Sequence, residues 1–495
     1  MKLLYRRCAG LDVHKETISV CVRIRRSDSQ QVEIQEKVFG AFTQELERLR
    51  DWLRENKVKQ VAMESTGVYW IPVWNILEPA SCGLELLLVN PQTVRALRGC
   101  KTDRIDARRI AEYLQYGLLH GSFVPPRPIR QLRDLTRMRV QVQHDRNRVI
   151  NRMGRLLETV NLKLSSVTRK IAGVSGRAIL KAIARGKTQP EDLASLAVGS
   201  LKAKKAALAL ALRGRYSDHF RWLLGQLLED LERLDGELAT LDSHIDREMQ
   251  PHAELVCRLC TLPGVERLTA WVLIAELGVE MSQFPDAKHA ASWAGLCPGN
   301  AESAGKRFSG KTRKGDRYLR RILVQNAWAV SHMKDCFLTA VFYRIAHNCG
   351  RKKAAVAVAH RILVMAYHII RDGTEYRERG GDYFDRVDAE RTAVRLSQRL
   401  ERIGYDVVLT RRPEAQTAEE AVRRRGRPCK CKERGIPCNH PGPRPSRPRR
   451  GLLPTKPAPA SAACSRCAKW GIACIHVRPR KPNGNFSGPT AKSTS

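Results

Sequence analysis

Residues 8–24 read Cys-Ala-Gly-Leu-Asp-Val-His-Lys-Glu-Thr-Ile-Ser-Val-Cys-Val-Arg-Ile. The two halves of this segment, Cys8–His14 and Thr17–Ile24, are rich in residues that favour strands, and they predict a β-hairpin. Val32–Phe39 has alternating apolar residues and predicts a third strand. Three strands so close together in the chain indicate that the N-terminal part is built on a sheet.

Helical and strand patterns alternate in the residues that follow. Thr43–Asn56 has helical spacing, with Leu46, Leu49, Trp52 and Leu53 on one face. Further strands are predicted at 58–64 and 84–89, and further helices from residue 68 and at 103–114. Pro125-Pro126 closes this part, so residues 1–125 are predicted to form one domain around a mixed α/β sheet.

The rest of the chain is predicted to be mainly helical, which makes the fold class α/β plus α. Residues 126–250 are predicted to form a helical or coiled-coil linker, with leucines at helical spacing at positions Leu223, Leu224, Leu227, Leu228, Leu231, Leu234, Leu238 and Leu241. These leucines fit a helical hairpin, a coiled coil that joins two protomers or acts as a spacer, or a plain packed helical domain. Residues 251–373 are predicted to form a second compact domain, and residues 374–410 a small helix-strand extension.

The charge of the chain indicates the class of its partner. Its 495 residues include 88 Lys and Arg against 50 Asp and Glu, a net charge of +38. Charge of this size repels itself unless a polyanion neutralises it, and nucleic acid is the polyanion that fits. The plainer alternative is a basic chain that merely stays soluble. Residues 411–495, with 20 Lys and Arg against 4 Glu, are predicted to be a disordered basic tail.

Secretion and membrane insertion are both disfavoured. The N-terminus has no apolar stretch long enough for a signal peptide. The longest apolar run, Ala354–Ile370, is interrupted by His360 and Arg361 and predicts a buried helix. The 15 cysteines are therefore expected to be thiols or metal ligands in a cytoplasmic, nucleoid-associated protein.

Four carboxylates stand at positions that suit a metal site. Asp12 lies in the first predicted strand, Glu64 ends a later one, and Asp103 and Asp106 share a helix face because they are three residues apart. A carboxylate at the end of an apolar strand is costly to bury unless it is paired or holds a cation. A pair of Mg²⁺ ions at a phosphate needs an oxygen-rich clamp of this kind. Each acid taken alone also fits a helix cap or a surface charge.

The order of these acids carries a resemblance to a known family. The matching segments are Leu11-Asp12-Val13-His14-Lys15, Glu64-Ser65-Thr66-Gly67-Val68-Tyr69-Trp70 and Lys101-Thr102-Asp103-Arg104-Ile105-Asp106-Ala107. They resemble the RuvC-like, ribonuclease H-like nuclease domain of the DEDD transposases, insertion-sequence recombinases related to Piv-type DNA invertases. The resemblance implies that Asp12, Glu64, Asp103 and Asp106 bind two Mg²⁺ ions. It also implies homo-oligomers, as dimers or tetramers, and some family members use a bridge RNA as a guide.

A basic segment farther along resembles the family's C-terminal transposase domain. Residues 293–307 read Trp-Ala-Gly-Leu-Cys-Pro-Gly-Asn-Ala-Glu-Ser-Ala-Gly-Lys-Arg, and Ser309-Gly310-Lys311-Thr312-Arg313-Lys314-Gly315-Asp316-Arg317 follows. The resemblance implies that Ser303 is a nucleophile that becomes joined to a 5′ phosphate of DNA. Cations that would gather scissile phosphates surround it at Lys306, Arg307, Lys311, Arg313 and Lys314. Ser309 is a rival nucleophile, and a purely structural loop serine is the plainer alternative.

Two further motifs in this region have alternative interpretations. Thr261–Val265 followed by Ala270–Ile274 resembles a helix-hairpin-helix turn whose next helix could hold a phosphate at its N-terminus. Glu266 stands where the family commonly has glycine. Gly305–Thr312 satisfies the P-loop pattern, but residues 297–304 are not expected to form the strand that a P-loop follows, so ATP binding is disfavoured.

The tail contains two similar islands of metal-ligand residues. Each has three cysteines and one histidine, namely Cys429, Cys431, Cys438 and His440 in the first and Cys464, Cys467, Cys474 and His476 in the second. This is the ligand count of a structural Zn²⁺ site, although free thiols in a flexible tail are the alternative. Arg424-Arg425-Gly426-Arg427-Pro428 resembles an AT-hook, so Arg425 and Arg427 are candidate minor-groove contacts.

These observations predict a DNA transposase or site-specific recombinase acting on donor ends and a target. A metal-dependent nuclease or junction resolvase, with water as nucleophile and Ser303 structural, is the first alternative. A non-catalytic basic scaffold on nucleic acid is the second, and a Walker-type ATPase is the third.

Overall fold

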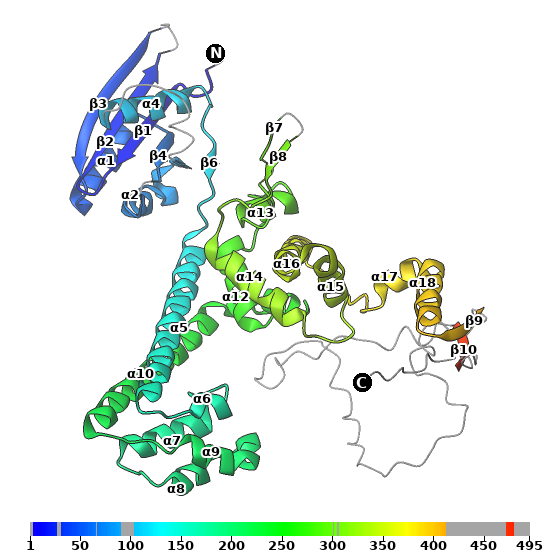
Figure 1. Cartoon of the computed structure of the whole chain (residues 1–495). Helices are drawn as coiled ribbons and strands as arrows, with labels where there is room; N and C mark the ends of the chain where they lie inside the picture. Colours follow the sequence, from blue (N-terminus) through cyan, green and yellow to red (C-terminus); the bar gives the residue numbers. More distant parts are fainter. Residues whose placement is uncertain are drawn as a thin grey trace, which may run out of the picture. The chain divides into compact units, whose positions relative to one another are not determined.

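The computed structural model describes residues 3–26, 31–65, 67–90, 103–299, 301–303, 306–411 and 472–479 (Figure 1). The chain divides into two compact units, Met1–Pro126 and Arg127–Ser495. Each unit is described by itself.

The N-terminal unit is a mixed sheet with helices on both faces. Its elements in chain order are β1 (Arg7–Val13), β2 (Thr17–Arg25), β3 (Val32–Gly40), α1 (Thr43–Glu55), β4 (Gln60–Glu64), α2 (Trp70–Leu77), a 3₁₀ turn (Ala80–Cys82), β5 (Glu85–Val89), α4 (Asp103–Gln115) and β6 (Gly121–Ser122). The strand order is β3-β2-β1-β4-β5-β6. Strands β1, β2 and β3 are antiparallel, whereas β4 is parallel to β1 and β5 is parallel to β4. The mixed α/β sheet predicted from the sequence is confirmed.

The alternation of side chains along β1 divides the core of this unit into two layers. Ala9, Leu11 and Val13 pack with Leu46, Leu49 and Leu53 of α1 on one face, and α2 completes that layer. On the other face, Cys8 packs with residues of α4 such as Ile110 and Leu114. Because strand side chains alternate, Gly10 and Asp12 share the α4 face with Cys8.

Gly10 is where α4 comes closest to the sheet. A Cβ at Gly10 would lie 2.3 Å from the Ala111 backbone nitrogen and 2.4 Å from the Ala107 carbonyl oxygen. We expect Gly10→Ala to lower the free energy of unfolding by about 3 kcal/mol, because neither backbone can yield without moving the helix. Gly40→Ala is the matched control, since its Cβ would meet only the flexible Glu45 side chain, at 3.3 Å. Urea denaturation of both variants tests this, and equal midpoints would contradict it.

The second unit begins with a long helix and is predominantly helical. Its elements up to the serine segment are α5 (Arg127–Thr159), α6 (Leu164–Val167), α7 (Val174–Ala184), α8 (Pro190–Ser195), a 3₁₀ turn (Gly199–Lys204), α9 (Lys205–Ala211), α10 (Asp218–Glu248), a 3₁₀ turn (Gln250–His252), α11 (Ala253–Leu259), α12 (Arg267–Leu277) and α13 (Ala287–Trp293). The remaining elements are β7 (Ala301–Ser303), β8 (Lys306–Ser309), α14 (Arg317–Val330), α15 (Phe337–Cys349), α16 (Arg351–Asp372), α17 (Tyr383–Val387), α18 (Ala389–Arg402), β9 (Tyr405–Arg411) and β10 (Ile472–Pro479).

Helices α5 and α10 form an antiparallel hairpin within one chain (Figure 1). Arg139 forms an ion pair with Asp242, and Arg146 forms one with Asp235. Residues later in α5 therefore contact residues earlier in α10, which shows that the two helices are antiparallel. The predicted leucines that are buried in this part of the chain all belong to α10, and they are Leu224, Leu228, Leu231, Leu234, Leu238 and Leu241. The arrangement is the helical hairpin among the alternatives above, and a coiled-coil joint between protomers stays a prediction.

The C-terminal part of this unit has its own apolar core around α12, α14 and α16. Helix α16 is, within the part of the chain that the structure describes, the one helix long and apolar enough to cross a membrane by length and composition. Its buried residues, including Ile362, Leu363 and Ala366, pack into this core. The buried helix predicted for Ala354–Ile370 is confirmed.

A small extension ends the described chain. Helix α18 and strand β9 correspond to the helix and strand predicted within residues 374–410, and β10 pairs antiparallel with β9.

Candidate active site

Asp12 lies in the middle of the sheet, on the face covered by α4. Its side chain is 7% exposed, and its Oδ2 lies 3.1 Å from Nε2 of His14. Strand β1 is flanked by β2 and β4, and Asp12 pairs with Ser19 across β2. The sequence therefore places a carboxylate where water has little access, which is unfavourable unless other groups compensate for its charge.

Glu64 lies next to Asp12 on the neighbouring strand. The parallel register pairs Gly10 with Ala62 and Leu11 with Met63, so one further step along both strands brings Asp12 beside Glu64. Because side chains alternate, Glu64 shares the face of Ala62, which packs with Ile110 of α4. Two carboxylates from different parts of the chain thus meet at the edge of the sheet formed by the C-terminal ends of the central strands β1 and β4.

The first turn of α4 lies toward the same edge. Cys8 donates a hydrogen bond from Sγ to the Ala111 carbonyl at 3.4 Å, and Gly10 contacts both Ala111 and Ala107. Residues later in β1 therefore contact residues closer to the N-terminus of α4. The next residue of β1 on this face is Asp12, and α4 begins at Asp103.

Asp103 and Asp106 are the two acids of that first turn. The Asp106 side chain is 27% exposed, and its Oδ1 lies 3.9 Å from Nη1 of Arg109. The side chain of Asp103 lies outside the described residues. Among the side chains that are described, no three His, Cys, Asp or Glu groups gather closely enough to hold a metal ion. Among the described side chains, the structure places Asp12 beside Glu64 but brings no third acid close enough to complete a ligand set.

The chemistry of these donors fits a hard divalent cation. The acids offer carboxylate oxygens, the ligands that Mg²⁺ prefers, and two of them stand on adjacent strands. Two thiols, those of Cys8 and Cys21, lie nearby on the strands that α4 covers. Burial raises the pKa of Cys8 to about 12 and that of Cys21 to about 11, so both stay protonated beneath α4.

The serine segment forms a short hairpin in the second unit. Strands β7 and β8 pair antiparallel, with Ser303 opposite Lys306 and Ala301 opposite Ser309. Ser303 is thus beside the turn of the hairpin, whereas Ser309 is at its base. The side chains of 301–303 and 306–309, which include Lys306 and Arg307, are outside the described part. Those of Lys311, Arg313 and Lys314 are described and exposed.

Backbone hydrogen bonds and close backbone contacts join the two legs at the base of this hairpin. The Gly299 nitrogen donates to the Lys311 carbonyl at 2.9 Å, and Pro298 bridges to Thr312. A Cβ at Gly315 would lie 2.2 Å from the Gly295 nitrogen, so the two legs approach as closely as glycines allow. The hairpin is a strand pair, and its first strand lies in residues 297–304, for which the sequence predicted no strand.

This hairpin bears on the P-loop pattern at Gly305–Thr312. The expectation that residues 297–304 form no strand was wrong, because Ala301–Ser303 is β7. The pattern nevertheless lacks the P-loop context, since residues 306–309 are themselves a strand and the next helix begins only at Arg317.

The predicted helix-hairpin-helix turn is a tight turn between α11 and α12. Gly264 has φ +78°, a conformation that favours glycine, and a Cβ there would lie 2.6 Å from Cγ2 of Val330. Glu266 occupies the N-cap of α12, and nearly the whole helix is buried. A phosphate contact at this helix stays a prediction.

Most of the predicted tail sites lie outside the described residues. These are Arg425, Arg427, Cys429, Cys431, Cys438, His440, Cys464 and Cys467. Cys474 and His476 belong to β10, whose side chains are not described. The zinc sites and the minor-groove contacts therefore stay predictions.

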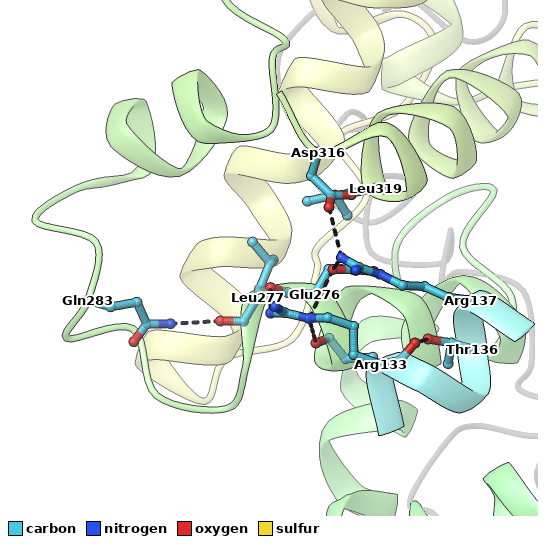
Figure 2. Close-up of polar contacts among 9 residues, drawn as sticks. Arg133, Thr136, Arg137, Glu276, Leu277, Gln283, Asp316 and Leu319 are labelled. Carbon is cyan, nitrogen blue, oxygen red and sulfur yellow. Dashed lines mark hydrogen bonds and ion pairs between the residues drawn. The ribbon is translucent and has the colours of Figure 1, made fainter. Parts of the chain in front are cut away.

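A buried ion-pair network that was not predicted from the sequence lies near the serine hairpin (Figure 2). Glu276 of α12 is paired with Arg133 and Arg137 of α5, and Arg137 also contacts Asp316. Asp316 before Arg317-Tyr318-Leu319 has the pattern of a helix N-cap, a signal that could have been found. Nothing in the sequence around Glu276 indicates partners so distant in the chain.

Comparisons with known proteins match both regions that carry the predicted site. Residues 9–162 match a DEDD-type transposase family named for IS110, and residues 257–342 match the transposase IS116/IS110/IS902 family. A probable family 20 transposase of Pseudomonas aeruginosa is 27% identical over 287 residues, covering 57% of this chain and 74% of the relative. The transposase for insertion sequence element IS1328 of Yersinia enterocolitica is 28% identical, covering 54% of this chain and 69% of the relative.

A solved structure of RuvC from Thermus thermophilus also aligns with the chain. The alignment covers 23% of this chain and 99% of RuvC, at 16% identity and a TM-score of 0.19. A TM-score of this size supports no conclusion about activity.

Proposed function

We propose that this chain is a transposase of the kind that its two family matches describe, and that it cuts and rejoins DNA. Both matches confirm the family resemblance predicted from the motifs around the four acids and around Ser303. The proposal is that Ser303 attacks a DNA phosphodiester at a Mg²⁺ site formed by Asp12, Glu64, Asp103 and Asp106. The chain then acts on donor ends and a target as a recombinase.

One observation carries the proposal. Asp12 and Glu64 stand side by side on β1 and β4, and the contacts of Gly10 aim the first turn of α4 at the same edge. An acid as buried as Asp12 beside a second acid is a poor arrangement for stability. It is a good arrangement for binding cations at a phosphate.

The four acids would hold the metal ions by their carboxylate oxygens. When bound, Mg²⁺ would neutralise charge on the phosphate and favour the ionised form of a nearby hydroxyl. The positions of the four acids would determine where the negative charge of the phosphate is neutralised. His14, whose Nε2 is 3.1 Å from Asp12, orients the carboxylate from the strand side.

The strand-transfer chemistry follows from a serine nucleophile. Attack by Oγ of Ser303 forms an Oγ–P bond and breaks the bond between phosphorus and the 3′ oxygen, which leaves as a 3′-hydroxyl after taking up a proton. A 3′-hydroxyl of another strand then attacks the phosphoserine and releases Ser303. Because one phosphodiester is exchanged for another, rejoining needs no ATP.

The basic residues of the hairpin provide the grip on DNA in this proposal. Lys311, Arg313 and Lys314 are exposed directly after the strands that carry Ser303 and Ser309, and Lys306 and Arg307 are part of β8. Arg425 and Arg427 would add contacts from the tail. Homo-oligomerisation, a guide RNA and structural Zn²⁺ in the tail are further parts of the proposal that the family resemblance or the cysteine pattern suggests.

Metal removal tests this function. We expect the purified full-length protein, incubated with Mg²⁺ and DNA that contains its own element ends, to cut and rejoin strands. EDTA should abolish both reactions, and added Mg²⁺ should restore them, because the acids proposed to hold the cations would otherwise repel one another and the phosphate. Gel analysis of labelled strands measures this. Full activity in EDTA would contradict the proposed site.

A further inference from the structure

A fully buried carboxylate lies at the junction of three helices in the second unit. The Glu276 side chain is 0% exposed. Its two oxygens accept hydrogen bonds from Nε and Nη2 of Arg137, both at 2.8 Å. Nε of Arg133 lies 3.1 Å from Oε2 of the same carboxylate. Burial raises the pKa of Glu276, and the hydrogen bonds from Arg137 oppose that rise.

Arg137 extends this contact to the segment that carries the serine hairpin. Its Nη2 donates to Oδ2 of Asp316 at 3.2 Å (Figure 2). Asp316 is 10% exposed, and its other oxygen accepts the Leu319 nitrogen at 2.7 Å as the N-cap of α14. The Arg137 guanidinium also lies 4.8 Å from the centre of the Tyr318 ring. One guanidinium thus joins α5, α12 and the start of α14.

Asp316 is where the second leg of the serine hairpin ends. Its backbone nitrogen donates to the Trp293 carbonyl at 3.2 Å, just before the first leg begins. Arg320, one turn into α14, donates from Nη1 to the Gly295 carbonyl. A displacement of Asp316 would therefore move both legs of the hairpin together.

Packing of the three helices does not by itself require charged groups at this junction. Apolar side chains of similar volume hold helices together at least as well as a buried ion pair. A bidentate arginine-carboxylate contact instead fixes direction, because its geometry is planar and two-pronged.

We propose that the Arg137 bridge between Glu276 and Asp316 positions the base of the Ser303 hairpin for reaction. Arg137, Glu276 and Asp316 are positioning residues, since they act through the hairpin and touch no reacting atom. The inference rests on the proposed serine chemistry. Arg133 braces the same junction by donating from Nη2 to the Glu276 backbone carbonyl at 2.9 Å.

The test separates the bridge from the helix cap. In Asp316→Ser, the hydroxyl can still cap α14, but it offers no second oxygen to Arg137. We expect the rate of covalent adduct formation on DNA to fall about 100-fold, as for a misplaced reactive group. DNA affinity and melting temperature should change little. Asp286→Ser is the matched control, because Asp286 caps α13 by accepting the His289 nitrogen and is not part of the bridge.

A second pair of variants keeps the test decisive if Asp316→Ser unfolds. Arg137→Lys retains the charge but not the two-pronged contact, so it should show the same rate loss with wild-type DNA affinity. Arg137→Lys combined with Asp316→Ser should be no slower than either alone. Additive losses, or a lowered melting temperature with an unchanged adduct rate, would overturn the inference. Absence of any adduct in the wild-type protein would instead overturn the proposed function.

Discussion

Asp12→Asn is expected to lower DNA strand cleavage by about a thousand-fold or more, as removal of a central charged group from a phosphoryl-transfer site does. Asparagine has nearly the shape of aspartate and can still bond to His14, so the fold should remain intact. It lacks the negative charge that would hold a cation beside Glu64. Gel assays with labelled element ends in Mg²⁺ measure the loss.

The thermal stability of Asp12→Asn should change in the opposite direction to its cleavage activity. Asp12 is buried beside another acid, so removing its charge should leave the melting temperature unchanged or raise it. Asp51→Asn is the matched control, because Asp51 is an exposed carboxylate on α1 that pairs with Arg50. That variant should retain cleavage. Full cleavage activity in Asp12→Asn, equal to that of Asp51→Asn, would contradict the metal-binding role proposed for Asp12.

Ser303→Ala is expected to abolish the covalent protein–DNA adduct, whereas Ser309→Ala should still form it. Ser303 is beside the turn of the β7–β8 hairpin, and Ser309 is opposite Ala301 at its base. A residue next to the turn can approach a phosphate with little rearrangement, whereas one at the base lies farther along the strands from the turn. Without an Oγ at position 303 no phosphoserine forms, so rejoining should stop as well.

The adduct is measured by denaturing gel electrophoresis after reaction with end-labelled DNA. Melting temperatures of both alanine variants control for folding, and DNA affinity controls for binding. Loss of the adduct in Ser309→Ala alone would assign the nucleophile to the rival serine. An adduct in Ser303→Ala would remove Ser303 from the mechanism.

The N-terminal unit was predictable because its signals are local. Strand-favouring residues in Cys8–His14 and Thr17–Ile24 and alternating apolar residues in Val32–Phe39 predict three strands, and the structure has strands there. Asp12 and Glu64 could be expected to approach each other because each lies toward the end of its strand. The close packing of α4 on Gly10 was not foreseen, since it depends on which helix residue meets that glycine.

The second unit was less predictable, for physical reasons. Residues 301–309 lack apolar alternation, so the pairing of β7 with β8 depends on the turn and on the close approach of Gly295 and Gly315. The bridge from Arg137 to Glu276 and Asp316 joins residues 139 and 179 positions apart. Such contacts leave no periodic signal, whereas the leucines of α10 recur at helical spacing and were found.

The origin of the oxygen atoms at the cut phosphate tests the central proposal most directly. Cleavage of element-end DNA in water enriched in oxygen-18 distinguishes a serine from a water nucleophile, and mass spectrometry of the products reads the label. The serine mechanism predicts a nucleotide attached to the peptide that contains Ser303, and rejoined strands whose phosphate contains no solvent oxygen. A free 5′ phosphate with one oxygen-18 atom and no labelled peptide would contradict it and identify a metal-dependent nuclease.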